Sequence, residues 1–339
     1  MKRLVLLAWI LLVPVASAYA QFNFINIDCT VAGGTAVRGI NNLGEMVGNT
    51  GPDQWNLHAV LIKAGKCIPL APNTILGTNW SDAYKINDQG DVVGYFNDDF
   101  GFPHGFLLSH KGVLTQLNFP GAGDTAAQGI NASGTVVGWF DDYDAYGNFI
   151  AEHGFVWKNG SFSQVDYPGS GDTSVYAIND FGAMLGTWDS GYPDYTEHGF
   201  VRSITGKFTT YDVPVAGEIF TQGNGINDLG LFVGEYVDAS VFYHGFLQVG
   251  PWFSSINYPG AYATSAWGIN IFGLIVGNHF NSESDFENYI LHGYVAVANG
   301  KDDVAQHLPT PPVPAKVVAA AGGRAVSRPH TNARHPSSY

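Results

Sequence analysis

The chain has 339 residues, of which 14% are aromatic and 43 are glycine, so it can bury a sizeable core and is not a low-complexity polymer. Its formal net charge is −14, and residues 21–300 hold 8 Lys and Arg against 27 Asp and Glu. An acidic body repels phosphate backbones, which argues against nucleic acid as a partner and leaves cations, glycans and proteins open.

The first twenty residues have the pattern of a secretory signal. Lys2 and Arg3 precede an apolar run from Leu4 to Val15, and small residues follow up to Ala20. The apolar run is too short to span a bilayer comfortably, and no later segment is long and apolar enough. The sequence predicts cleavage near Ala20 and export of a protein without a membrane span, either secreted or periplasmic.

Residues 22–300 consist of six copies of one unit. An Ile-Asn pair followed by a turn recurs with successive asparagines 46, 44, 48, 48 and 43 residues apart. A histidine followed by a small and then an apolar residue recurs once per copy. A period in the forties indicates a repeat architecture. The asparagines are Asn41, Asn87, Asn131, Asn179, Asn227 and Asn270, and the histidines are His58, His104, His153, His198, His244 and His292.

The copy that begins at Thr125 divides into four expected strands. These are residues 125–131, 135–140, 153–158 and 161–167, and the Asn159-Gly160 pair between the last two is a strong hairpin signal. Four short antiparallel strands in a unit of this length are typical of a propeller blade. No window has a helical apolar stripe, which argues against a helical solenoid.

The two ends of the repeat region are complementary. The sixth copy lacks a fourth strand, whereas Phe22–Ile27 lies where a fourth strand precedes each later copy. Pairing this segment with the last copy would remove the unpaired sheet edges. The sequence therefore predicts an all-β, six-bladed β-propeller closed by its N-terminal strand, monomeric, with a disordered Pro/Ala-rich tail at 301–339.

The chain has two cysteines, Cys29 and Cys67. An exported protein favours a disulfide between them. The repeat alignment argues the other way, because it places them at opposite ends of equivalent strands in neighbouring copies, where the sulfurs should lie too far apart. Our expectation is that they are not bridged.

The repeated residues resemble the extracellular repeats of the HAF family, named after His-Ala-Phe. The Gly-Ile-Asn motif, the Val-Gly pairs that follow it and the His-Gly-Phe triplets carry this resemblance over residues 22–300. Only His58-Ala59-Val60 has alanine in the middle. The resemblance implies exported bacterial proteins with a β-propeller fold and supplies no catalytic residues.

A residue that recurs in every blade is most simply explained by folding. We interpret the six histidines as hydrogen-bonding side chains spread around the rim, too far apart to share a metal ion. The six asparagines are expected to cap their own tight turns.

Candidate ligand-binding residues should break the repeat and share one face. The loops between second and third strands and the fourth-to-first-strand connections emerge on the same side, here called the loop face. Carboxylates with aromatic rings suit sugars, which stack on rings and donate hydroxyl protons. The candidates are Tyr95, Trp139, Trp188, Tyr192, Tyr236, Asp98, Asp99, Asp141, Asp189, Asp238 and Trp267.

One loop has a partial calcium pattern. Asp142 and Asp144 are followed by Glu152, one residue earlier than an EF-hand loop requires, and Tyr146 takes position five. The pattern predicts at most a weak calcium site, and no other cofactor is indicated.

The position offset by one residue before each Ile-Asn pair varies among the copies, and innermost strands line a propeller's channel. It holds Arg38, Tyr84 and Trp267 among others, and His279 would neighbour Arg38 once the ring closes. Arg38, His279 and Tyr84 could neutralise a uronate and move a proton, as a glycan lyase requires.

The leading functional hypothesis is an exported binding module that takes a glycan or an extracellular protein on its acidic, aromatic loop face. The alternative from another class is a glycan-active enzyme that uses the same face, either a glycoside hydrolase with paired carboxylates or a polysaccharide lyase. A passive envelope or matrix component is the third hypothesis. Repeats do not reveal the ligand, because loop geometry decides recognition.

Overall fold

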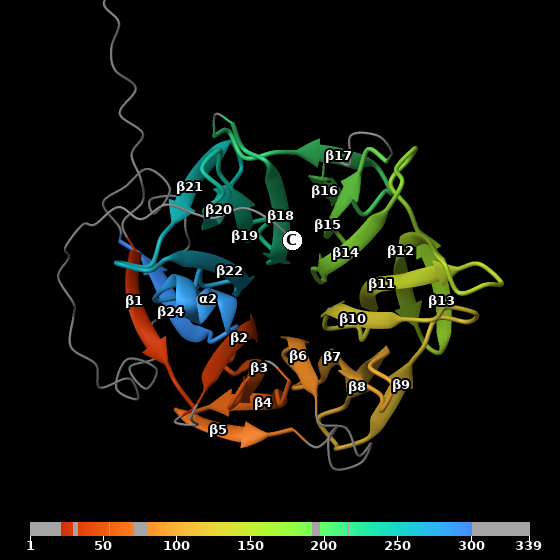
Figure 1. Cartoon of the computed structure of the whole chain (residues 1–339), viewed down its shortest axis with the longest axis horizontal. Helices are drawn as coiled ribbons and strands as arrows, with labels where there is room; N and C mark the ends of the chain where they lie inside the picture. Colours follow the sequence, from red (N-terminus) through yellow and green to blue (C-terminus); the bar gives the residue numbers. More distant parts are fainter. Residues whose placement is uncertain are drawn as a thin grey trace, which may run out of the picture.

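The computed structural model describes residues 22–29, 33–53, 55–70, 80–191, 197–215 and 217–299. Six antiparallel sheets of four strands surround a central axis (Figure 1). The predicted six-bladed β-propeller is confirmed. The leader at 1–20, the tail at 301–339 and Tyr192 lie outside the described residues.

Blades 1 to 3 follow the chain from the innermost to the outermost strand. Their strands are, for blade 1, β2 (Gly34–Ile40), β3 (Met46–Gly51), β4 (His58–Lys63) and β5 (Lys66–Pro69); for blade 2, β6 (Ser81–Ile86), β7 (Val92–Asn97), β8 (Pro103–Leu108) and β9 (Leu114–Leu117); and for blade 3, β10 (Thr125–Ile130), β11 (Val136–Tyr143), β12 (Phe149–Lys158) and β13 (Ser161–Val165).

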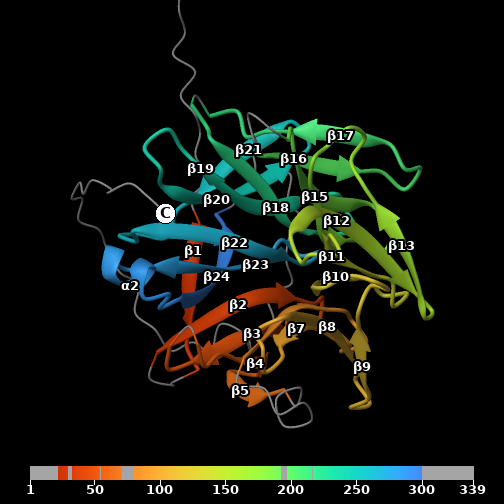
Figure 2. The same cartoon turned by 45° about the vertical axis from the view of Figure 1, so that its right-hand side comes forward.

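Blades 4 and 5 repeat this order, and blade 6 takes its outermost strand from the N-terminal segment. The strands are, for blade 4, β14 (Thr173–Ile178), β15 (Met184–Asp189), β16 (Glu197–Arg202) and β17 (Phe208–Tyr211); for blade 5, β18 (Phe220–Ile226), β19 (Phe232–Val237), β20 (Tyr243–Val249) and β21 (Trp252–Ile256); and for blade 6, β22 (Ala263–Ile269), β23 (Ile275–Phe280), β24 (His292–Ala298) and β1 (Phe22–Ile27). A short helix, α2 (Glu283–Glu287), lies beside β23 in the loop that leads to β24 (Figure 2). Within the described residues, no helix has the length and hydropathy needed to cross a bilayer.

Ring closure occurs as expected. β1 pairs antiparallel with β24 along its whole length, from Phe22 opposite Ala298 to Ile27 opposite Gly293. Figure 1 shows the first strand and the last lying side by side. This pairing supplies the fourth strand of blade 6 and leaves no blade with a missing partner.

The repeated Val-Gly pair has a steric cause. A Cβ atom at Gly138 would lie 1.9 Å from the carbonyl oxygen of Ala126 on the neighbouring strand, and Gly48, Gly94, Gly186 and Gly234 meet equivalent oxygens at 1.9–2.0 Å. Only glycine allows the first two strands of a blade to approach this closely at the bulge in the inner strand.

The turn asparagines link each blade to the next. Asn131 accepts hydrogen bonds from the backbone N–H groups of Ser133 and Thr135 through Oδ1, which closes its own turn. Its Nδ2 donates to the backbone oxygen of Asn179 in blade 4 at 3.2 Å. The same donation runs through all six asparagines and returns from Asn270 to Asn41 at 3.3 Å. A circle of six side-chain hydrogen bonds therefore joins the blades around the axis.

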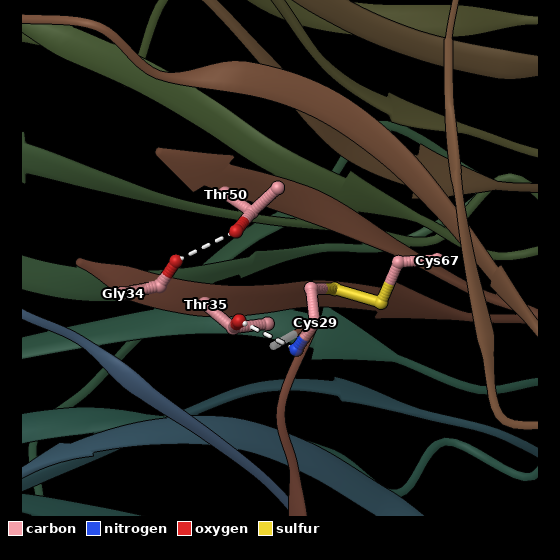
Figure 3. Close-up of a disulfide and its surroundings, with 5 residues drawn as sticks. All are labelled: Cys29, Gly34, Thr35, Thr50 and Cys67. Carbon is pink, nitrogen blue, oxygen red and sulfur yellow. Dashed lines mark hydrogen bonds between the residues drawn. A yellow bond between two sulfur atoms is a disulfide. The ribbon is translucent and has the colours of Figure 1, made fainter. Parts of the chain in front are cut away.

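The expectation that Cys29 and Cys67 are not bridged is wrong. They form a disulfide with Cα atoms 5.5 Å apart (Figure 3). β1 ends at Ile27, so Cys29 belongs to the connection that crosses from blade 6 to blade 1, not to the strand. There it packs between the two blades with Val37, Val60 and Val276, and its backbone N–H donates to Thr35 Oγ1 at 3.0 Å. The disulfide ties the closing strand to the outer strand of blade 1.

Candidate functional site

The loop face carries charge of one sign. Every charged residue in the loops between second and third strands and in the fourth-to-first-strand connections is acidic. Because strands in a blade alternate in direction, the other two sets of turns emerge on the opposite side, here called the turn face. At or beside its outer turns lie six basic residues: Lys63, Lys66, Lys111, Lys158, Arg202 and Lys207. The turn face therefore carries charges of both signs, because Glu45, Asp88, Asp91, Asp180 and Asp228 lie at its inner turns, whereas the loops and connections of the loop face carry only acidic charges.

The acidic residues concentrate on blades 3 and 4, which share a set that other blades lack. A Gly-x-Gly-Asp-Thr connection ends at Asp124 in one blade and at Asp172 in the next. A second aspartate, Asp141 or Asp189, follows on the second strand, and a glutamate, Glu152 or Glu197, precedes the repeated histidine. In each blade the second aspartate and the glutamate lie opposite each other on adjacent strands.

Hydrogen bonds connect these two sets across the boundary between the blades. The backbone N–H of Glu152 in blade 3 donates to Asp172 Oδ1 in blade 4 at 2.8 Å, and the Ser174 hydroxyl donates to the Glu152 carboxylate. Within blade 3, the Tyr143 hydroxyl donates to Asp124 Oδ2 at 2.8 Å. Asp124 is 8% exposed, and its Oδ1 has no partner in the described residues.

The crowding of carboxylates changes their acidity. Burial, helped by the charges of Asp141, Asp172 and Glu197, raises the pKa of Glu152 to about 8. Burial and the adjacent Asp124 raise the pKa of Asp141 to about 6. The pKa values of Asp172 and Glu197 are raised for the same two reasons, first burial and then nearby carboxylates. At neutral pH this site therefore holds both protonated and ionised carboxyl groups.

A pocket of about 270 Å³ opens among these residues on the loop face. Glu152, Asp172, Asp189 and Glu197 provide its carboxylates, and Tyr176 with Phe149 provides aromatic surface. Of the expected ligand residues, Asp141 and Asp189 lie in or beside this acidic cluster. Trp139 is partly exposed and lies two residues before Asp141 on the same face of β11.

Trp188 and Tyr236 occupy a repeated stacking position. Trp188 stacks on Tyr167 with ring centroids 4.3 Å apart and also contacts His198 at 5.0 Å. Tyr236 is 4% exposed, stacks on His244 and hydrogen-bonds Ser255 through its hydroxyl. Phe96 and Phe140 contact the histidines of their blades in the same way. These rings contribute to the core of each blade, although the edge of Trp188 reaches the pocket.

Tyr95 and Trp267 lie in the channel, around Arg38. The Arg38 guanidinium is 4.0 Å from the Trp267 ring and 5.4 Å from that of Tyr84, which stacks on Tyr95. Arg38 Nε donates to Asp82 Oδ2 at 3.3 Å, and one Nη donates to the Tyr289 hydroxyl. Burial lowers the pKa of Arg38, but Asp82, Tyr289 and Tyr84 outweigh it and raise the pKa overall. Arg38 is 4% exposed, so side chains fill this part of the channel.

The structure does not bring His279 to Arg38. The His279 ring stacks on Tyr258 at 3.6 Å and contacts His292, which places it in the aromatic position of blade 6. Its neighbour Asn278 faces blade 1 instead and accepts a hydrogen bond from the Val37 backbone. Burial and the charge of His292 lower the pKa of His279 to about 3. The expected triad of Arg38, His279 and Tyr84 is not assembled.

The three calcium candidates are also kept apart. Asp144 Oδ1 accepts hydrogen bonds from the backbone of Tyr146 and Asn148 and so closes the loop tip, while Glu152 reaches Ser174. Asp142 lies opposite Ala151 on the strand pair between them. Across the described residues, no three His, Cys, Asp or Glu side chains converge as metal ligands.

Two other aspartates of the expected ligand set close their own loops. Asp98 Oδ1 accepts from the backbone of Phe100 and Phe102, and its Oδ2 contacts His104. Asp238 does the same with Ser240, Phe242 and His244, while Asp99 is exposed at its loop tip. The remaining repeated histidines also have partners. Three of them contact aspartates: His153 contacts Asp166, His198 contacts Asp212 and His292 contacts Asp285. His58 has a partner as well.

Sequence reasoning missed two kinds of loop-face residue, the aspartates of two connections and several exposed aromatic rings. Asp124 and Asp172 were overlooked although their Gly-x-Gly-Asp-Thr context occurs twice, which was an available signal. Trp55 and Phe100 are 74% and 86% exposed in their loops, and Phe149, the first residue of β12, is 52% exposed. Tyr146, in the loop that precedes β12, is 91% exposed. The most exposed of these rings therefore lie in the loops.

No protein-family model and no curated protein sequence matches the chain. Solved structures with similar folds include a streptogramin B lyase, 13% identical over 83% of this chain and 99% of that one, with a TM-score of 0.44. The β-propeller domain of a protease from Pyrococcus furiosus is 9% identical over 79% and 97%, with a TM-score of 0.42. A six-bladed fucose-recognising lectin from Aleuria aurantia is 11% identical over 67% and 79%, with a TM-score of 0.33.

These likenesses concern the fold alone. The chain is a six-bladed β-propeller.

Proposed function

We propose that this chain is an exported binding module whose loop face takes a glycan that is neutral or bears free amino groups. The observation that carries the proposal is the combination of a carboxylate-lined pocket with a face that has no basic residue in its loops and connections. Export rests on the leader pattern at residues 1–20.

The chemistry of the pocket favours a ligand rich in hydrogen-bond donors. Ionised carboxylates only accept, and each can accept from several hydroxyl or ammonium groups. Sulfated or uronate glycans would instead be repelled by the ionised carboxylates of the pocket. A volume of about 270 Å³ is near the lower end of the roughly 300–1,000 Å³ of ligand pockets, which suits one or two sugar rings rather than a protein loop.

Aromatic surface is available next to the carboxylates. Tyr176 and Phe149 line the pocket. Trp139 lies two residues before Asp141 on the same face of β11. The exposed tips at Trp55, Phe100 and Tyr146 extend this surface around the loop face. A sugar ring that places its C–H groups against one aromatic face can direct its hydroxyls to carboxylates beside it.

The test is a calorimetric comparison of matched oligosaccharides. Glucosamine oligomers with free amines, the same oligomers N-acetylated, and uronate oligomers of equal length are titrated into the full chain at low salt. We expect binding of the first two and none of the third. Preference for the uronate, or no binding to any neutral or amine-bearing glycan in a broad screen, contradicts the proposal.

Two charge-matched variants locate the site. Glu197→Gln removes one carboxylate from the pocket and should weaken glucosamine binding at least tenfold, by about 1.4 kcal/mol. Asp88→Asn removes the same charge from the turn face and should leave the affinity unchanged. Equal effects of both variants would mean that only net charge matters.

One observation favours a second candidate, glycoside hydrolysis in the same pocket. Glu152 has a pKa of about 8 and can therefore donate a proton at neutral pH, while Asp141 opposite it has a pKa of about 6 and is ionised. A pair of carboxylic groups in these two states is what hydrolysis of a glycosidic bond requires. New reducing ends from a bound glycan, lost in Glu152→Gln with binding retained, would establish this activity. The lyase alternative loses its proton-transfer group with His279.

A further inference from the structure

Lys85 breaks the repeat at a position where the other blades have almost no side chain. The residue just before the isoleucine of each Ile-Asn pair is Lys85 in blade 2 and glycine or alanine elsewhere: Gly39, Gly129, Ala177, Gly225 and Gly268. A Cβ at Gly225 would lie 2.8 Å from the Trp267 backbone oxygen, which shows how closely the inner strands approach here. A long amine at this position needs an explanation of its own.

The side chain of Lys85 reaches into the channel wall. Its Nζ donates to the backbone oxygen of Arg38 in blade 1 at 3.1 Å. Lys85 also lines a pocket of about 90 Å³ where the channel opens on the turn face, inside the circle of asparagines. This pocket lies at the opposite end of the molecule from the proposed glycan site.

Several charged groups face this amine. Arg38 and Asp82 lie deeper in the channel, and Asp88, Asp180 and Asp228 line the mouth. Burial and the neighbouring Arg38 charge lower the pKa of Lys85 to about 7, against the opposing effect of Asp82. About half of the Lys85 side chains are then neutral at pH 7, and a neutral amine is the nucleophilic form.

We propose that Lys85 is a covalent modification site that forms an imine with small neutral aldehydes entering through the turn-face mouth. The Lys85 nitrogen forms a bond to the aldehyde carbon, the carbonyl oxygen takes up two protons and leaves as water, and a C=N bond remains. No oxidant or reductant is required. The carboxylates at the mouth disfavour anionic carbonyl compounds.

The size of the pocket limits the reactant. The pocket has a volume of about 90 Å³, which favours a carbonyl compound of a few heavy atoms over a bulky aromatic aldehyde. The outer turns of the same face provide internal comparisons, because Lys63 is 57% exposed on its side chain and Lys111, Lys158 and Lys207 lie in or beside the corresponding turns of blades 2, 3 and 4.

The experiment is reductive trapping on the intact chain. Glycolaldehyde with cyanoborohydride is added at pH 7, and the labelled fraction of every lysine is measured by peptide mass spectrometry at short times. We expect Lys85 to be labelled at least tenfold faster than any turn-face lysine outside the channel. Labelling of Lys85 at the same rate as the other lysines, or more slowly, overturns the proposal. The role of Lys85 would then be structural, through its hydrogen bond to the Arg38 backbone oxygen.

Two controls separate access from reactivity. Benzaldehyde under the same conditions should label Lys85 more slowly, relative to the outer lysines, than glycolaldehyde does. Lys85→Arg, which keeps a donor for the Arg38 oxygen but cannot form an imine, should abolish the fast phase. The wild-type labelling pattern decides the question even if that variant does not fold.

Discussion

The bond between Cys29 and Cys67 takes the place of an aromatic pair in blades 3 and 4. At the positions equivalent to the two cysteines, Phe119 contacts Phe162 with ring centroids 5.4 Å apart, and Tyr167 contacts Phe208 at 5.3 Å. Each of these crossover residues also donates its backbone N–H to the first threonine of the next blade, as Cys29 does to Thr35. A covalent link thus replaces a ring contact at the boundary between blade 6 and blade 1.

This equivalence gives a matched test of the disulfide. Cys29→Ser with Cys67→Ser should lower the free energy of unfolding by about 3–4 kcal/mol, the entropy expected for a 38-residue loop. The melting temperature should fall by roughly 6–12 °C, and reducing agent should have the same effect on the wild type. Cys29→Phe with Cys67→Phe should recover part of the loss by restoring the aromatic contact. A double-phenylalanine variant no more stable than the serine variant would contradict the equivalence.

The buried Arg38 and Asp82 pair predicts strong coupling in a double-mutant cycle. Arg38→Leu leaves the Asp82 carboxylate buried without its cation and should cost about 3–5 kcal/mol in urea unfolding. Arg38→Leu combined with Asp82→Leu should cost less than Arg38→Leu alone, because no unpaired charge remains. Equal stabilities of the single and double variants would show that the Trp267 contact, not the ion pair, dominates.

His279 predicts a specific acid sensitivity. Its pKa is about 3 in the folded chain against 6.5 for an ordinary histidine, so the unfolded chain binds more protons between these values. The stability that neutral His279 contributes is therefore present above about pH 6.5 and is lost as the pH falls towards 3. His279→Phe, which installs the residue found at Phe96 and Phe140, should be more stable than the wild type by about 2 kcal/mol at pH 5. The difference should be small at pH 8. Thermal unfolding at both pH values measures it, and a difference that does not depend on pH would exclude this cause.

Glu152 predicts the opposite slope. Its folded pKa of about 8 lies above the ordinary value of 4.5, so the folded chain binds more protons between the two. Stability should be greatest below about pH 4.5 with respect to this group and should decrease as the pH rises to 8. Glu152→Gln, which keeps the hydrogen bond to Ser174 possible, should be stabilising at pH 8 and neutral at pH 4. Identical pH profiles of variant and wild type would mean that the carboxyl group is not held protonated.

The sequence was sufficient for the fold because the repeat encodes it. The Ile-Asn pairs close turns, the Val-Gly pairs allow close strand approach, and Phe22–Ile27 supplies the missing strand. The site was less accessible. Trp188 was assigned to a ligand because it breaks the repeat in residue type, although its position opposite His198 is aromatic in neighbouring blades. Strand alternation could have corrected this, and it could have separated His279 from Arg38.

Other features of the site depend on geometry that spacing does not contain. The hydrogen bond between Glu152 and Ser174 joins blade 3 to blade 4. The pKa of Glu152 depends mainly on its burial. The disulfide was rejected on strand geometry because nothing in the spacing showed that β1 ends before Cys29.

The asparagine circle has a sense of rotation: every amide reaches forward to the following blade, and the sixth reaches from Asn270 back to Asn41. In a linear stack, the outermost repeats have a single neighbour and fray first. Here no blade is terminal, because each one is hydrogen-bonded to both the preceding and the following blade. The domain should therefore unfold as one cooperative unit. The fold should then not depend on where the chain begins. A circular permutant that starts at another connection between blades should form the same six-bladed propeller.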